Sequence, residues 1–317
     1  MELRAYDQIP LRILTTNKCN GRCYFCHNEG VSQLYEKNIT LDIFKQAIAA
    51  ARKYQIRKIV LSGGEPTLSM NVEFVLHYVK ENYPDVMLSM TTNGANLALL
   101  LKSDLNFDKI NLSVSSFDRN VYSKYQRVEP LAILNMLYDR KINASVNIVV
   151  TKDNYKELNN IIDFCIKKNL SIEILFELRS YDLQEINGQL SLIKEIEDRY
   201  GYFFWKIDNI PSLKNNLCGK SSINIKHPYF NRYFSWDFCQ KCKNKNACFE
   251  RVCAVRVDEE GNIFPCLNHC INVKALTVEE SIHTCYSKID KAKMTRNLSE
   301  IFSLEDVLKP GRKDDLL

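Results

Sequence analysis

The feature that most constrains the fold is a regular alternation of short β-rich segments and longer amphipathic segments between residues 11 and 180. The longer segments repeat apolar residues at the spacing of one helix face, and the short ones are rich in β-branched residues. The expected strands are 11–16, 57–62, 86–92, 109–115, 143–151 and 171–178. Six βα units in series predict a parallel sheet with helices outside it, either a barrel or a doubly wound sheet.

Short polar motifs follow the first four expected strands. Three cysteines follow the first strand, SGGEP (62–66) the second, TTNG (91–94) the third and SSFD (115–118) the fourth. Because functional residues of parallel α/β folds lie at the carboxyl ends of the strands, these motifs are expected to meet at one edge of the sheet. The sequence therefore predicts a site at that edge.

The three cysteines after the first strand are Cys19, Cys23 and Cys26. Three ligands are one short of the four protein ligands that a structural zinc normally takes. Three thiolates can instead hold an iron–sulfur cubane and leave one of its irons free for a substrate or cofactor. The spacing thus predicts a metal site with an open position.

Composition excludes several classes of protein. The 317 residues are 45% hydrophobic and 26% charged, as in ordinary globular domains. No run approaches the roughly 18 apolar residues of a membrane span, and the N-terminus lacks the apolar region of a signal peptide. A cytoplasmic protein without a membrane partner is expected, in which twelve cysteines favour metal over disulfides. The net charge of +5 is spread along the chain, so no nucleic-acid partner is expected.

The pattern changes after about residue 200, where a second group of cysteines begins. These thiols are Cys239, Cys242, Cys248, Cys253 and Cys266. The residues 258–261 (DEEG) predict a hairpin turn between VCAVRV and NIFPC. We expect a small module that depends on metal, and we divide the chain into residues 1–200 and 201–317.

Three motifs together resemble the radical SAM superfamily. They are the CxxxCxxC loop with Phe25 before its last cysteine, GGEP at 63–66 and TNG at 92–94. The resemblance implies a partial (β/α)6 TIM-like barrel in which Cys19, Cys23 and Cys26 bind a 4Fe–4S cluster whose open iron chelates S-adenosylmethionine (SAM). It also implies reductive cleavage of SAM to a 5′-deoxyadenosyl radical, which abstracts hydrogen from a substrate, and a reductant such as flavodoxin or ferredoxin.

The same resemblance implies a set of SAM-contacting residues. The adjacent glycines would let the backbone approach the cofactor, and Glu65 with neighbouring carbonyls would accept from its ammonium. For Ser113 and Asn147 the alternative is a hydrogen bond from a strand end to a neighbouring loop. The expected cofactor-binding residues are Phe25, Gly63, Gly64, Glu65, Pro66, Asn93, Ser113 and Asn147.

The second cysteine group resembles the auxiliary-cluster modules called twitch or SPASM domains. From this resemblance we expect one auxiliary 4Fe–4S cluster, with Cys253 as the substitute if one ligand is free. A four-cysteine zinc site is the alternative that spacing leaves open. The expected ligands are Cys239, Cys242, Cys248 and Cys266.

The substrate is the open question. The chain resembles the GTP 3′,8-cyclases of molybdenum-cofactor biosynthesis (MoaA), and Arg12 and Arg256 match arginines that face the substrate in that family. Other cationic residues of the family are replaced in this chain, and the family's C-terminal Gly-Gly is absent. We therefore predict a biosynthetic or peptide-modifying maturase that acts on a small molecule or a peptide, the latter with a separate recognition protein. The alternatives are the GTP cyclase and, in another class, a non-catalytic iron–sulfur or zinc scaffold.

Overall fold

The computed structural model describes most of the chain. The described residues are 5–30, 35–102, 107–179, 182–207, 211–217, 221–228, 230, 234–245, 248, 250–267, 269–271, 277–289 and 292–294.

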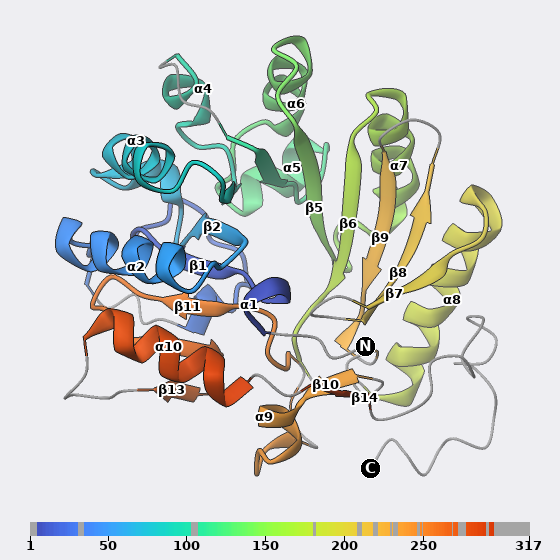
Figure 1. Cartoon of the computed structure of the whole chain (residues 1–317). Coiled ribbons are helices and arrows are strands. Elements are labelled where there is room, and N and C mark those ends of the chain that lie inside the picture. Colours follow the sequence, from blue (N-terminus) through green and yellow to red (C-terminus); the bar gives the residue numbers. More distant parts are fainter. Residues whose placement is uncertain are drawn as a thin grey trace.

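One twelve-stranded sheet forms the centre of the molecule, in the order β13-β12-β11-β1-β2-β3-β4-β5-β6-β9-β8-β7 (Figure 1). The first six strands along the chain, β1 to β6, are parallel, and each lies within a predicted strand. They are β1 Leu11–Leu14, β2 Lys58–Ser62, β3 Met87–Thr92, β4 Lys109–Ser113, β5 Ala144–Val150 and β6 Ser171–Phe176. The predicted parallel sheet is confirmed.

Helices follow the parallel strands and cover the outside of the curved sheet (Figure 1). They are α2 Leu41–Lys53, α3 Val72–Asn82, α4 Leu97–Leu100, α5 Arg119–Lys124, α6 Pro130–Asp139, α7 Leu158–Lys167 and α8 Leu183–Tyr200. Two buried apolar clusters join these helices to the same face of the strands. Because a doubly wound sheet carries helices on both faces, this arrangement is the barrel-like one of the two alternatives.

The alternation of side chains along the strands produces an apolar outer face and a polar inner face. In β1, Leu11 and Ile13 are fully buried against the helices, whereas Arg12 lies on the opposite face. In β5, Val146 faces the helices and its neighbour Asn147 lies on the inner face. The inner face of the sheet therefore carries hydrogen-bonding side chains below the loops that hold the polar motifs.

Strands from the last third of the chain extend both edges of the sheet. At one edge β9 Ser222–Lys226 pairs with β6 in parallel, followed by the antiparallel β8 Pro211–Asn216 and β7 Phe204–Ile207. At the other, β11 Val255–Val257 pairs in parallel with β1 and continues into β12 Ile263–Cys266 and β13 His269–Ile271. The sheet therefore crosses the predicted division at residue 200, which falls at the end of α8.

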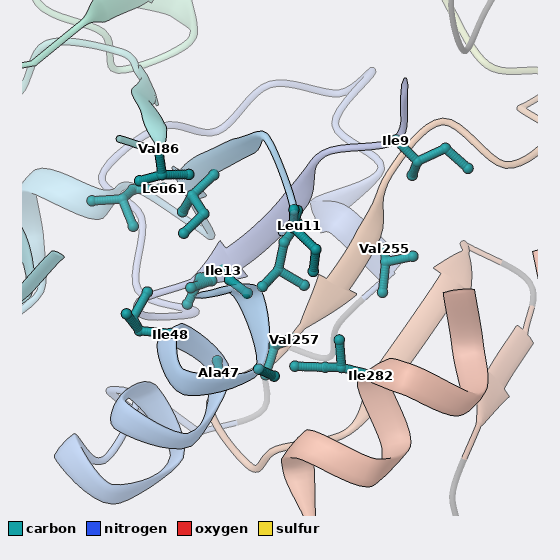
Figure 2. Packing of buried hydrophobic residues seen from close by; sticks show 14 of the residues in the cluster. Ile9, Leu11, Ile13, Ala47, Ile48, Leu61, Val86, Val255, Val257 and Ile282 are labelled. Carbon is teal, nitrogen blue, oxygen red and sulfur yellow. The ribbon is translucent and has the colours of Figure 1, made fainter. Parts of the chain in front are cut away.

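The predicted hairpin turn lies between β11 and β12, where Gly261 N donates to Asp258 O at 3.1 Å. Figure 2 shows Val255 and Val257 of β11 beside Leu11 of β1, with Ile282 of α10 packed near them. The helix α10 Val278–Ile289 packs on α2 and completes this layer (Figure 1).

The smaller elements are α1 Ala5–Gln8, α9 Asp237–Gln240, the pair β10 Phe234–Trp236 and β14 Ala292–Met294, and the 3-10 turns Asn28–Gly30, Pro66–Leu68 and Tyr155–Glu157. Among the helices of the described residues, none has the length and apolar character to cross a membrane.

Candidate functional site

The loop after β1 holds Cys19, Cys23 and Cys26, and each sulfur receives an N–H donor. The donors are Gly21 N to Cys19 at 3.2 Å, Arg127 Nε to Cys23 at 3.1 Å and Asn28 N to Cys26 at 3.3 Å. Burial raises the pKa of the Cys19 and Cys26 thiols, so a bound cation is what would hold them as thiolates. Three sulfurs with N–H donors fit the ligand set of an iron–sulfur cluster.

Gly63 and Gly64 hold the end of β2 directly against this loop. Gly64 N donates to Thr16 O at 2.7 Å, and Glu65 N donates to Lys18 O at 2.7 Å. A Cβ on Gly63, whose φ is +134°, would lie 2.2 Å from Thr16 O, and one on Gly64 would lie 2.3 Å from Lys18 O. The close approach that requires glycine here is between β2 and the cysteine loop.

Glu65 is buried and joins the ends of β2 and β3. Its Oε1 accepts from Thr67 N at 3.0 Å and from Thr92 Oγ1 at 2.5 Å, while its Oε2 accepts from Asn93 N at 2.6 Å. The first of these bonds caps the 3-10 turn that begins at Pro66. The carboxylate therefore organises the site, and a direct contact with SAM would have to use the remaining acceptor capacity of Oε2.

Asn93 contacts the cysteine loop, since its Nδ2 donates to Asn20 Oδ1 at 2.9 Å and lies 3.9 Å from Cys19 Sγ. The Phe25 ring packs edge-on against the Tyr125 ring, with centroids 5.6 Å apart. Both predicted cofactor residues thus lie at the loop itself.

Ser113 and Asn147 are register partners on β4 and β5. The backbone carbonyl of Ser113 accepts from Arg127 Nη1 at 2.8 Å. Asn147 Oδ1 is buried and has no hydrogen-bond partner among the described residues. A buried acceptor without a donor costs free energy of folding. The alternative for Asn147, a hydrogen bond to a neighbouring loop, would have satisfied this oxygen, whereas a bound ligand could still supply the donor.

The two predicted substrate arginines are brought together on adjacent strands. Arg12 and Arg256 are register partners, and both bind Glu29, through Arg12 Nη1 at 2.8 Å and Arg256 Nε at 2.7 Å. Arg256 Nη2 also donates to Glu250 Oε1 at 2.5 Å. Burial alone would raise the pKa of Glu29, but the two arginines outweigh it and hold that pKa well below its usual range.

Three residues of this site carry no motif in the sequence: Arg127, Glu29 and Glu250. Arg127 follows Cys23 by 104 positions, and Arg256 follows Glu29 by 227. Only the pairing of distant strands and loops brings these partners together, so no local spacing could have indicated them.

The four predicted auxiliary ligands line one pocket, which is partly open to solvent. The lining residues are Phe238, Cys239, Cys242, Asn244, Lys245, Cys248, Arg251 and Cys266. Cys253 is not among them, because its Sγ donates to Glu250 Oε1 at 3.2 Å.

Both predicted alternatives, an iron–sulfur cluster and a zinc ion, would use these four thiols. A zinc ion would need four of these sulfurs at about 2.3 Å; in the part of the chain that the structure describes, no three His, Cys, Asp or Glu side chains are drawn together around one point, and this is as true of Cys19, Cys23 and Cys26 as of the second group. Four thiols that line one pocket are also the number of ligands that a 4Fe–4S cluster takes.

Comparison of sequences gives a match to the family described as the Radical SAM superfamily over residues 13–165, just under half of the chain. A probable GTP 3′,8-cyclase of Methanocaldococcus jannaschii is 26% identical over 81% of this chain and 84% of its own length. The corresponding protein of Sulfurisphaera tokodaii is 26% identical over 92% and 90%. That of Thermococcus kodakarensis is 34% identical over 52% and 55%.

Solved structures share the fold. SuiB of Streptococcus suis bound to S-adenosylmethionine superposes with a TM-score of 0.61 at 14% identity over 87% of this chain, which spans only 64% of SuiB. The native protein anSMEcpe with bound AdoMet gives a TM-score of 0.59 at 14% identity, over 88% of this chain and 82% of its own.

Proposed function

The chain belongs to the radical SAM superfamily, and on that premise we propose that Cys19, Cys23 and Cys26 bind the 4Fe–4S cluster at which SAM is cleaved. The observation that carries this assignment is the N–H donor at each of the three sulfurs. The cluster, when bound, supplies the electron that breaks the S–C5′ bond of SAM, and the superfamily therefore needs a reductant. A flavodoxin or ferredoxin would serve, and the cytoplasm is the compartment that suits both this donor and the thiols.

The residues around the loop are assigned to SAM by their position. Gly63, Gly64 and Pro66 form the turn that lies against the cysteine loop, and Asn93 reaches that loop from β3. Ser113 and Asn147 would contact SAM from the inner face of the sheet. This proposal is supported by Asn147 Oδ1, which has no hydrogen-bond partner among the described residues and could accept a bond from SAM.

We test this assignment by adding SAM to reconstituted, dithionite-reduced protein and measuring 5′-deoxyadenosine. The wild-type protein should form it, and a variant with all three cysteines replaced by alanine should not. An intact cluster that leaves SAM uncleaved would support the non-catalytic scaffold instead.

The second cysteine group is assigned an auxiliary 4Fe–4S cluster on Cys239, Cys242, Cys248 and Cys266. The shared cavity of these four thiols supports this proposal, as does the engagement of Cys253 elsewhere. An iron and sulfide count of the reconstituted protein tests it, because one cluster in place of two would leave the cavity without a metal role.

The curated relatives favour GTP as the substrate, since they match up to 92% of this chain and carry the name GTP 3′,8-cyclase. We therefore propose GTP 3′,8-cyclisation as the first activity to test. The experiment incubates the reduced protein with SAM and GTP and searches for the cyclised nucleotide by mass spectrometry. Formation of 5′-deoxyadenosine without any cyclised nucleotide would reject GTP while leaving SAM cleavage intact.

A biosynthetic or peptide-modifying maturase is the second candidate, and one observation favours it. Arg12 and Arg256 already bind Glu29, and Arg256 also binds Glu250, so a triphosphate would have to compete with buried carboxylates for both arginines. A small molecule or peptide without phosphate would not need them. A peptide substrate would require direct docking or a separate recognition protein, which co-purification with a tagged chain would detect.

A further inference from the structure

The segment 125–127 forms a second wall of the three-thiol site. Arg22 N donates to Tyr125 O at 2.8 Å, and Asn20 Nδ2 donates to Gln126 O at 3.3 Å. Gln126 adopts a φ of +55°, in the left-handed region that non-glycine residues rarely occupy. The backbone turns there so that consecutive carbonyls and the next side chain all face the cysteine loop.

Arg127, the next residue, bridges the cysteine loop and the end of β4. Its Nε donates to Cys23 Sγ at 3.1 Å, and its Nη1 donates to the carbonyl of Ser113 at 2.8 Å. The planar guanidinium presents both donors in a fixed fork, so the second bond holds the first in place. A lysine could not make both contacts with the same geometry.

The positively charged guanidinium of Arg127 lies next to the Cys23 sulfur. Whereas Arg12 and Arg256 each pair with a carboxylate, Arg127 forms no ion pair within the described residues. Cys23 therefore has a guanidinium group and its N–H donor within hydrogen-bonding distance.

We infer that Arg127 is a positioning residue of the three-thiol site, which fixes the Cys23 sulfur and makes reduction of the metal cluster held there easier. The inference rests on the proposed function of that site. Reduction adds negative charge to a thiolate-bound cluster, and hydrogen bonds to the sulfurs and the net charge nearby are among the factors that set cluster potentials. A cation at Cys23 stabilises the reduced form more than the oxidised form.

The test compares Arg127→Gln and Arg127→Lys with the wild-type protein, and uses Arg119→Gln as a matched control. Arg119 is an exposed arginine at the start of α5, so this variant removes the same charge away from the thiols. To isolate the three-thiol site, every chain also carries Cys239→Ala and Cys242→Ala. The midpoint potential of the reconstituted cluster is measured by EPR-monitored titration in the absence of SAM, with iron content and thermal unfolding as checks.

We expect Arg127→Gln to make reduction about tenfold less favourable, a shift of about 59 mV to more negative potential for one electron. Arg127→Lys should fall between that value and the wild type, and Arg119→Gln should match the wild type. Equal potentials in the wild type and both Arg127 variants overturn the inference. If Arg127→Gln takes up no cluster, Arg127→Met decides, because it also removes the charge: a wild-type potential there overturns the inference and a lower one supports it.

Two further outcomes separate this inference from its premise. If Arg127→Gln keeps the wild-type potential without SAM but binds SAM more weakly, the arginine acts on SAM and the inference is wrong. If the unsubstituted three-thiol site assembles no cluster, the proposed function itself fails. SAM-dependent formation of 5′-deoxyadenosine by the otherwise native chain checks that premise independently of Arg127.

Discussion

Arg256 donates from Nε to Glu29 Oε2 at 2.7 Å, so a buried ion pair ties β11 to the segment that follows Cys26. The other side of the same guanidinium binds Glu250, whose Oε2 accepts from the backbone N–H of Leu267 at 2.8 Å. Leu267 is the residue after Cys266. One continuous chain of charged hydrogen bonds therefore connects the two groups of cysteines.

Glu29→Gln should destabilise the apo protein strongly, because it removes the shared partner of Arg12 and Arg256. Breaking a buried ion pair by neutralising one partner costs about 3–5 kcal/mol. Denaturant unfolding measures the change in the free energy of unfolding. The control is Glu36→Gln, whose partner is Lys18 and whose side chain is 68% exposed, for which we expect less than about 1 kcal/mol. Equal losses in the two variants would contradict the buried network.

Glu173 should contribute to stability in a pH-dependent way. Burial alone would raise its pKa, but Lys226 at 2.5 Å and Asn224 at 3.0 Å lower it from 4.5 to about 2. A depressed carboxyl pKa stabilises the folded state fully above the unfolded value, and this contribution is lost as the pH falls from 4.5 towards about 2. The difference in unfolding free energy between wild type and Glu173→Gln should thus be constant above pH 4.5 and shrink below it. A constant difference throughout would reject the lowered pKa.

Cys266→Ala should lower the metal content of the protein, and Cys253→Ala should leave it unchanged. Cys266 lines the auxiliary cavity, so its loss should remove or weaken one 4Fe–4S cluster. Cys253 donates to Glu250, and burial raises its pKa to about 12, so its replacement should leave the iron count unchanged. Iron and sulfide analysis of both reconstituted variants checks this. Loss of iron from Cys253→Ala alone would make Cys253 the ligand.

Gly63→Ala should impair the cysteine loop, because the new Cβ would lie 2.2 Å from Thr16 O at a φ of +134°. We expect a loss of at least about 1 kcal/mol, since a clash and an unfavourable conformation combine. Gly188→Ala is the control, as this glycine lies within α8 with no atom within 4 Å of the added Cβ. It should stabilise the protein by about 0.5–1 kcal/mol. Thermal unfolding and the iron content of both variants measure the contrast.

Local sequence signals were sufficient for the strands and for one helix start. The strands β1 to β6 could be predicted because each is a short β-rich run beside an amphipathic helix. Thr40 is of a residue type favoured at the N-cap, and it caps α2, where its Oγ1 accepts from Ile43 N at 3.3 Å. Asn154 is also of a favoured N-cap type and precedes the 3-10 turn Tyr155–Glu157 that leads into α7. Its side chain makes no capping bond there and binds the backbone of Thr151 and Ser115. The tertiary contact of that loop outweighed its local preference for a cap.

The same distinction applies to the candidate site. The three thiols could be predicted because their ligand spacing is local. The position of β11 between β1 and β12 could not, and it determines where Arg256 meets Glu29. The role of Glu65 also differs from the expectation, since its carboxylate is largely engaged by Thr67, Thr92 and Asn93. Contacts between distant segments depend on strand order, which periodicity does not encode.

The pairing of β1 with β11 also governs when this protein can become complete during its synthesis. Leu11 pairs with Val255, about 240 residues later in the chain. At roughly 5–20 residues per second, the partner of β1 emerges on the order of 10–50 seconds after β1 itself. Throughout that interval the outer edge of β1 lacks its neighbour, and Glu29 lacks Arg256. A nascent chain therefore presents its first three thiols well before the strand that pairs with β1 exists.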